Sequence, residues 1–97
     1  MTIAPPLLRE NRVAAIREAL QRAFAPTVLE IRDDSQRHAG HAGARDGRGH
    51  FDVTIASDAF AGMSMLARHR AVYAALGDLM TTDIHALSIQ ACTVEVP

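Results

Sequence analysis

The sequence predicts an α+β domain in which two helices pack on one face of a three-stranded sheet. Two segments carry apolar residues at helical spacing, and three short segments alternate apolar and polar residues as half-buried strands do. The predicted order is α-β-β-α-β, which suits an open sheet with its helices on one side. With 97 residues, the chain has room for one hydrophobic core. We expect a lead-in over residues 1–7 and a domain over residues 8–97.

The first helix is predicted over residues 8–24. Its apolar stripe has helical spacing and consists of Val13, Ile16, Leu20 and Phe24. Pro26 disfavours helical geometry at the residue before it, so the helix should stop at Ala25.

A pair of strands should follow the helix. Residues 27–33 (TVLEIRD) and residues 50–57 (HFDVTIAS) both alternate apolar and polar side chains. Strands that are neighbours in sequence commonly pair as an antiparallel hairpin, here with an unusually long loop at its tip.

The second helix is predicted over residues 63–80, after a turn-like stretch (SDAFAGMS) that contains Gly62. Its apolar stripe comprises Met65, His69, Val72, Leu76 and Leu79, with Tyr73 and Met80 beside it. The segment TTD should end this helix. Residues 85–96 (HALSIQACTVEV) should then form the third strand, with Leu87 and Ile89 on one face.

Charge and cysteine content narrow the function classes. The formal net charge is −1, so the basic excess typical of nucleic-acid-binding domains is missing. The single cysteine, Cys92, cannot form an internal disulfide and fits a reducing, cytoplasmic compartment. The sequence shows no apolar run of about 18 residues and no secretory signal. It also shows no nucleophile–base spacing and no phosphate loop, so we expect no enzymatic activity.

Three of the five histidines fall in the loop between the first two strands. His38, His41 and His50 share this segment with four of the six glycines. Histidine is the commonest neutral metal ligand, so the loop is a candidate metal site, and a solvated linker is the alternative. His85 stands at the start of the third strand, where its side chain can reach solvent or a partner, and a structural histidine is the alternative there.

The motif RHR places His69 on the apolar stripe of the second helix, between Arg68 and Arg70. We expect His69 to be buried and hydrogen-bonded rather than a ligand. The two arginines are candidates for contact with phosphates, carboxylates or a partner surface, and solvation alone is the alternative.

The segment GHAG, residues 40–43, matches the GxxG loop of KH domains, which also have this element order. In KH domains the loop joins two helices and clamps a nucleic-acid backbone. Here it lies between two strands, so we treat the match as coincidence.

Three motifs in order resemble the BolA-like protein family. The patterns F-x-G, R-H-R-x-V-Y and H-A-L occur in SDAFAGMSMLARHRAVYAAL and HALSIQA. The resemblance runs from Val13 to Thr93 and implies a KH-like fold with a helix-turn-helix-like segment. It implies a non-enzymatic partner of a monothiol glutaredoxin, which shares a [2Fe-2S] cluster with that protein and glutathione. The expected roles are iron–sulfur cluster maturation, cluster trafficking and iron regulation, with no cofactor in the isolated chain.

The resemblance also implies roles for individual residues. The histidine of H-A-L matches His85, and a loop with histidine but no cysteine resembles the histidine-loop type of the family. The loop ligand best matches His38, with His41 and His50 as alternates. Two imidazoles on one iron of a [2Fe-2S] centre have a precedent in Rieske sites.

The alternative function is a DNA-binding transcriptional regulator that uses Arg68 and Arg70 of the helix-turn-helix-like segment. A cysteine desulfurase activator is a further expected partner, because similar domains occur fused to such proteins. We expect a weak homodimer of the isolated chain and no membrane partner. Structural roles are expected for Gly62, His69 and Tyr73.

Overall fold

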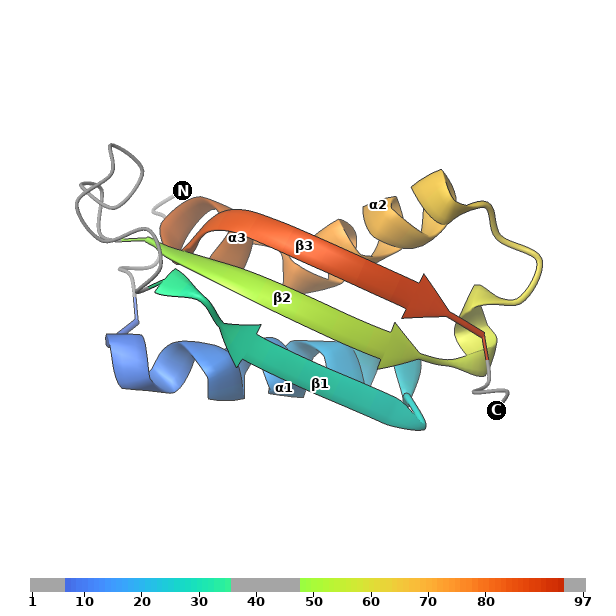
Figure 1. Cartoon of the computed structure of the whole chain (residues 1–97), viewed down its shortest axis with the longest axis horizontal. Coiled ribbons are helices and arrows are strands. Elements are labelled where there is room, and N and C mark those ends of the chain that lie inside the picture. The colour runs from blue at the N-terminus through green and yellow to red at the C-terminus, as the bar shows by residue number, and fades with distance from the viewer. Residues whose placement is uncertain (1–6, 36–47, 94–97) are drawn as a thin grey trace.

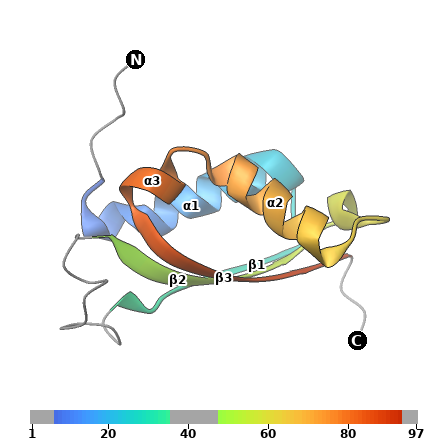
Figure 2. The ribbon, with the colours of Figure 1, turned by 90° about the horizontal axis from the view of Figure 1, so that it is seen from above.

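The described chain forms one sheet with helices on a single face. The computed structural model describes residues 7–35 and 48–93. In order, the elements are α1 (Arg9–Phe24), β1 (Val28–Asp33), β2 (Gly49–Ala56), the 3-10 helix η3 (Asp58–Phe60), α2 (Met65–Leu76), α3 (Leu79–Thr82) and β3 (Ile84–Cys92). Figure 2 shows α1, α2 and α3 on the same side of the sheet. The predicted α+β class, with helices on one face, is confirmed.

β2 is the central strand, antiparallel to β1 and parallel to β3 (Figure 1). The antiparallel β1–β2 pair confirms the predicted hairpin. The parallel pairing of β3 requires a crossover, and the segment with α2 supplies it by carrying the chain back along the sheet. The amino ends of β2 and β3 therefore lie side by side, next to the end of β1.

The apolar sides of the helices and the sheet meet in one core. Along β2, alternate residues are buried, as the predicted period of two requires. The buried apolar cluster consists of Ile16, Leu20, Phe51, Val53, Ile55, Phe60, Val72, Leu76, Ile84 and Ala91. Full burial of a large apolar side chain stabilises the fold by about 1.5–3 kcal/mol, so this cluster is the main source of stability.

α1 confirms the predicted first helix to within one residue. It ends at Phe24, where Ala25 takes a left-handed φ of 44° and its N–H donates to the Gln21 carbonyl at 3.0 Å. Pro26 has no N–H with which to continue the helix. Within the described part of the chain, no helix has the length and apolar character that crossing a membrane requires.

The second predicted helix, over residues 63–80, is wrong in its boundaries. α2 begins at Met65, where the Ser64 side chain caps the helix by accepting a hydrogen bond from the Ala67 N–H at 3.1 Å. It ends at Leu76, because Gly77 adopts a left-handed φ of 55° that an L side chain rarely takes. The remaining residues form the separate short helix α3.

The predicted apolar stripe is correct for only part of α2. Val72 and Leu76 are buried, but Met65 is 53% exposed, so the contact of α2 with the core begins beyond its first turn. Gly62 precedes the helix with a φ of 78°, which confirms the predicted turn.

Candidate metal-ligand site

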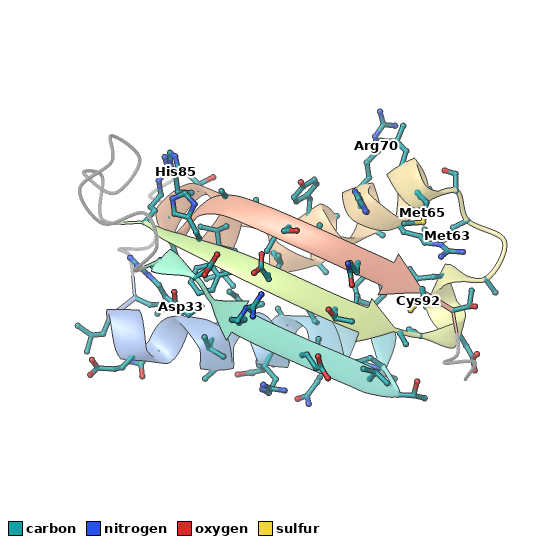
Figure 3. All side chains as sticks on the ribbon, viewed as in Figure 1. Asp33, Met63, Met65, Arg70, His85 and Cys92 are labelled. Atoms are coloured by element: carbon teal, nitrogen blue, oxygen red, sulfur yellow. The ribbon has the colours of Figure 1, made fainter. Side chains whose placement is uncertain are left out.

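Two histidines lie side by side at the amino ends of β2 and β3. The ring centroids of His50 and His85 are 5.1 Å apart, and the rings are tilted by 51°. The parallel pairing brings them together, because it aligns the starts of two strands that are distant in sequence. His85 is exposed at the end of the sheet (Figure 3), whereas His50 is half-buried and its Nε2 atom is buried.

A β-bulge sets the direction of His85. Gly49 pairs with Ile84, but the next residue, His50, pairs with Ala86, so β3 contains one extra residue, His85. By simple alternation His85 would share the core-facing side of the strand with Leu87. The bulge instead leaves Ile84 in the core and His85 at the exposed end of the sheet.

The chain segments on either side of residues 36–47 are both held next to this histidine pair. The Asp34 N–H donates to the His50 carbonyl at 2.7 Å, and the His50 N–H donates to Ser35 Oγ at 3.0 Å. Gly49 permits this close approach, because a Cβ atom there would lie 2.7 Å from both Ser35 Oγ and a ring carbon of Phe51. The described chain therefore stops at Ser35 and resumes at Arg48 beside His50 and His85.

Arg48 contacts His85 directly. One terminal nitrogen of its guanidinium lies 3.3 Å from His85 Nδ1, and the other lies 3.5 Å from the Thr81 carbonyl oxygen. A guanidinium has only donors, so in this contact Nδ1 of His85 is the acceptor. The histidine pair thus has a permanent positive charge at its edge.

A shallow cavity of about 250 Å³ opens beside His50. It is lined by Asp34, His50, Phe51, Asp52, Ala86, Leu87 and Ser88. Of the histidine pair, His50 borders this cavity.

A buried ion pair, which sequence reasoning missed, fixes the start of β3. Asp83 Oδ1 accepts hydrogen bonds from Arg12 Nε at 3.0 Å and from the Leu7 N–H at 2.8 Å. Thr82 Oγ1 donates to the other carboxylate oxygen at 2.6 Å. The Asp83 carbonyl accepts from the Gly49 N–H at 2.9 Å. This network ties α1 and both histidine-bearing strands together.

The sequence did contain a signal for this ion pair. Arg12 stands four residues before Ile16 and eight before Leu20, so it belongs to the buried face of α1 rather than to its polar faces. Its side chain is accordingly only 6% exposed, and that of Asp83 is 2% exposed. A charge on an apolar stripe requires a buried partner.

The network lowers the pKa of Asp83 below its ordinary value of 3.8. Burial alone raises the pKa, but hydrogen bonds from Thr82, Arg12 and the Leu7 N–H, with the charge of Arg12, outweigh that effect. Asp83 is therefore an ionised anchor two residues before His85.

The other predicted ligands are His38 and His41, and both lie outside the described residues. Among residues 7–35 and 48–93, no group of three or more histidine, cysteine or acidic side chains is placed to hold a metal ion. His50 and His85 supply two imidazoles, which is the number that a Rieske-type iron takes. Among the described residues, His50 and His85 are thus the neighbouring pair of imidazoles at this end of the sheet.

The two predicted nucleic-acid contacts differ sharply. Arg68 is half-buried, and its guanidinium donates to the carbonyls of Met63 at 3.1 Å and Ala91 at 3.0 Å. Arg68 thus joins the start of α2 to the end of β3, and its predicted role in nucleic-acid binding stays a prediction. Arg70 is exposed and points away from the sheet (Figure 3).

The remaining predicted residues have varied environments. His69 is half-buried, and its buried Nε2 has no hydrogen-bond partner among the described residues, so the predicted hydrogen bond is missing at that atom. Tyr73 is 41% exposed and lies outside the buried core. Cys92 is exposed at the far end of β3 from His85 (Figure 3). The thiol therefore lies at the opposite end of the sheet from the histidine pair.

Comparison with known proteins supports the resemblance. Residues 20–95 match the family model of the BolA-like proteins. The chain is 47% identical over 83 residues to protein BOLA1, chloroplastic, of Arabidopsis thaliana. The matched region covers 82% of this chain and 52% of that protein. It is 40% identical over 80 residues to the DNA-binding transcriptional regulator BolA of Escherichia coli. That match covers 82% of this chain and 73% of that protein. The solved structure of BolA1 from A. thaliana matches with a TM-score of 0.76 at 41% identity, over 90% of this chain and 98% of that one.

The chain spans about half the length of the Arabidopsis relative, whose name places that protein in the chloroplast. The cytoplasmic location predicted for this chain therefore stays a prediction. The family match covers most of the described domain, and the matching structure has the same fold. The chain belongs to the BolA-like protein family.

Proposed function

We propose that the protein is a partner of a monothiol glutaredoxin and co-ligates a [2Fe-2S] cluster with it during cluster maturation and trafficking. Support comes from the position of His85, an exposed imidazole beside His50 and beside both ends of the segment that carries His38 and His41. An exposed ligand at the end of a sheet can be reached by a second protein, whereas a buried one cannot.

The chemistry suits a shared cluster. This chain provides imidazoles at one end of its sheet, and its Cys92 lies at the other end. A glutaredoxin cysteine and the thiol of glutathione would supply the thiolate ligands. The cluster is cargo in this function, so a site with few ligands of its own suits release as well as binding.

His85 is the first ligand in this proposal, and the second comes from the loop. His38 is three residues beyond Ser35, so covalent geometry keeps its α-carbon within about 11 Å of that of Ser35. Ser35 itself contacts His50, the neighbour of His85. We therefore keep His38 as the second ligand of the proposal, with His41 as an alternate. His50 already lies beside His85, but its Nε2 is buried.

Visible absorption and circular dichroism test this function. The protein is mixed with a monothiol glutaredoxin, glutathione, ferrous iron and a sulfide source, and the heterodimer is isolated. We expect a cluster spectrum that His85→Ala alters strongly and that one of His38→Ala, His41→Ala and His50→Ala alters in the same way. Gln90→Ala, at an exposed position of β3, is the matched control. A parent-like spectrum from His85→Ala would remove His85 from the ligand set.

The name of the E. coli relative favours DNA binding as a second candidate function. Arg70 is then the candidate phosphate contact on α2, because Arg68 is engaged with backbone carbonyls. If DNA is bound through α2, Arg70→Ala should lower the salt dependence of binding by about one unit of the log–log slope. An unchanged slope would exclude Arg70 as the phosphate contact.

A further inference from the structure

Arg48 stands between the chain turn at the end of α3 and the imidazole of His85. Its guanidinium is 3.3 Å from His85 Nδ1 and 3.5 Å from the Thr81 carbonyl oxygen. The next residue, Gly49, is fixed by its N–H bond to the Asp83 carbonyl at 2.9 Å. The backbone that carries Arg48 is therefore anchored by the same residue that precedes β3.

The direction of the Arg48–His85 contact follows from the donors available. A guanidinium has five N–H donors and no acceptor, so the lone pair of Nδ1 faces Arg48. A neutral imidazole has one protonated nitrogen and one with a free lone pair. With Nδ1 as the acceptor, neutral His85 carries its proton on Nε2.

Metal binding requires the same lone pairs. A metal that binds through Nδ1 uses the lone pair that faces Arg48, and so it displaces the guanidinium. A metal that binds through Nε2 requires the ring proton to move, through solvent, from Nε2 to Nδ1. The Nδ1–H would then oppose the N–H donors of Arg48. Either mode of binding breaks the contact with Arg48.

We propose that Arg48 is a positioning residue that holds His85 in the tautomer unable to bind metal through Nε2 and that must withdraw before His85 becomes a ligand. The inference rests on the proposed function, in which His85 is the ligand. The Arg48–His85 contact would lower the affinity of the free chain for metal and so favour release of the cluster. A partner that drew the guanidinium away with a carboxylate would favour loading.

The size of the effect follows from the geometry. The contacts that join the Arg48 guanidinium to His85 Nδ1 and to the Thr81 carbonyl are long for hydrogen bonds, and Arg48 is only half-buried. A hydrogen bond of this kind has a modest net value, so removal of Arg48 should tighten metal binding at His85 by about 3- to 10-fold.

Two measurements on the full chain test the role of Arg48, and neither requires a cluster. The first is the ¹⁵N NMR spectrum of the His85 ring at about pH 8, where a free imidazole is neutral. The parent should show protonated Nε2 and unprotonated Nδ1, and Arg48→Ala should raise the share of the Nδ1–H form. Arg70→Ala, which removes an exposed arginine elsewhere, is the control and should leave the ring unchanged. An identical tautomer ratio in the parent and Arg48→Ala would overturn the proposal.

The second measurement is a titration with Ni²⁺ alone, followed by isothermal titration calorimetry in about 1 M salt, so that variants without His85 are measured in the same way. The Debye length is then about 3 Å, which limits the effect of removing a positive charge. Arg48→Ala should bind about 3- to 10-fold more tightly than the parent, and the gain should vanish in Arg48→Ala/His85→Ala. Equal affinities in the parent and Arg48→Ala would overturn the proposal. The proposed function fails separately, if His85→Ala leaves the glutaredoxin cluster spectrum unchanged.

Discussion

Arg12 and Asp83 form a buried ion pair with an Nε–Oδ1 distance of 3.0 Å, although they are 71 residues apart in sequence. The pair fixes α1 against the start of β3, two residues before His85. Through its carbonyl, Asp83 also holds Gly49, the neighbour of His50. The candidate site is thus built on an electrostatic anchor at the edge of the core.

Loss of this ion pair should destabilise the fold strongly. Asp83→Asn leaves the buried guanidinium of Arg12 without its counter-charge, so we expect the free energy of unfolding to fall by about 3–5 kcal/mol in chemical denaturation. The matched control is Glu18→Gln, because the ion pair of Glu18 with Arg22 is exposed and should contribute less than about 1 kcal/mol. Equal losses in the two variants would show that Asp83 is not an anchor. The double variant Arg12→Leu/Asp83→Asn should be more stable than Asp83→Asn alone.

The contribution of Asp83 should depend on pH in a defined direction. Its pKa is lowered in the folded state, so its stabilising effect is complete above the ordinary value of 3.8 and is lost as the pH falls below that value. The stability difference between the parent and Asp83→Asn should therefore narrow on acidification from about pH 5 to pH 2. Denaturation curves over this range measure the difference, and a gap that stays constant or widens would contradict the lowered pKa.

Gly49→Ala should disturb the histidine site more than a typical surface substitution. The added Cβ would meet Ser35 Oγ and a ring carbon of the buried Phe51, each at 2.7 Å. We expect a loss of about 1–3 kcal/mol in the free energy of unfolding and a shifted NMR signal for the His50 ring. Ser88→Ala, at an exposed position on β3, should change stability by no more than about 0.5 kcal/mol. A parent-like His50 signal in Gly49→Ala would show that position 49 tolerates a side chain beside Ser35 and Phe51.

Replacing Arg68 and replacing Arg70 with alanine should lower the free energy of unfolding by different amounts. Arg68→Ala removes charged hydrogen bonds to the carbonyls of Met63 and Ala91 and should cost about 1–3 kcal/mol. Arg70→Ala removes an exposed side chain and should stay within about 0.5 kcal/mol of the parent. Thermal or chemical denaturation checks both values. Two equally mild variants would mean that Arg68 does not hold α2 to β3.

The local hydrophobic periodicity predicted the helices and strands but not all of the residues at which they begin and end. The stripe from Val13 to Phe24, followed by Pro26, was sufficient to predict α1 to within one residue. The periodicity around Val72 and Leu76 was equally clear, but it continued past Gly77, whose left-handed backbone ends α2. A hydrophobic period does not reveal the backbone angle that a glycine adopts, so the predicted helix was too long.

The same limit applies to Arg12. Its place in the helical period indicated burial, but a period cannot name a partner 71 residues away. Arg68 shows the converse case, in which a residue typical of a solvated surface is engaged with two backbone carbonyls. Both roles depend on which segments the fold brings into contact.

The sequence by itself determined the α+β class, the order of the elements and the hairpin, and its resemblance to the BolA-like family made His85 a candidate ligand. These follow from local periodicity and from motifs, which are properties of neighbouring residues. Only the tertiary structure decided that β3 runs parallel to β2 and that a bulge stands opposite Gly49 and His50. An antiparallel β3 would have placed His85 at the other end of the sheet from His50. Strand direction and register depend on how the crossover through α2 packs against the core, so no local pattern contains the pairing of these two histidines.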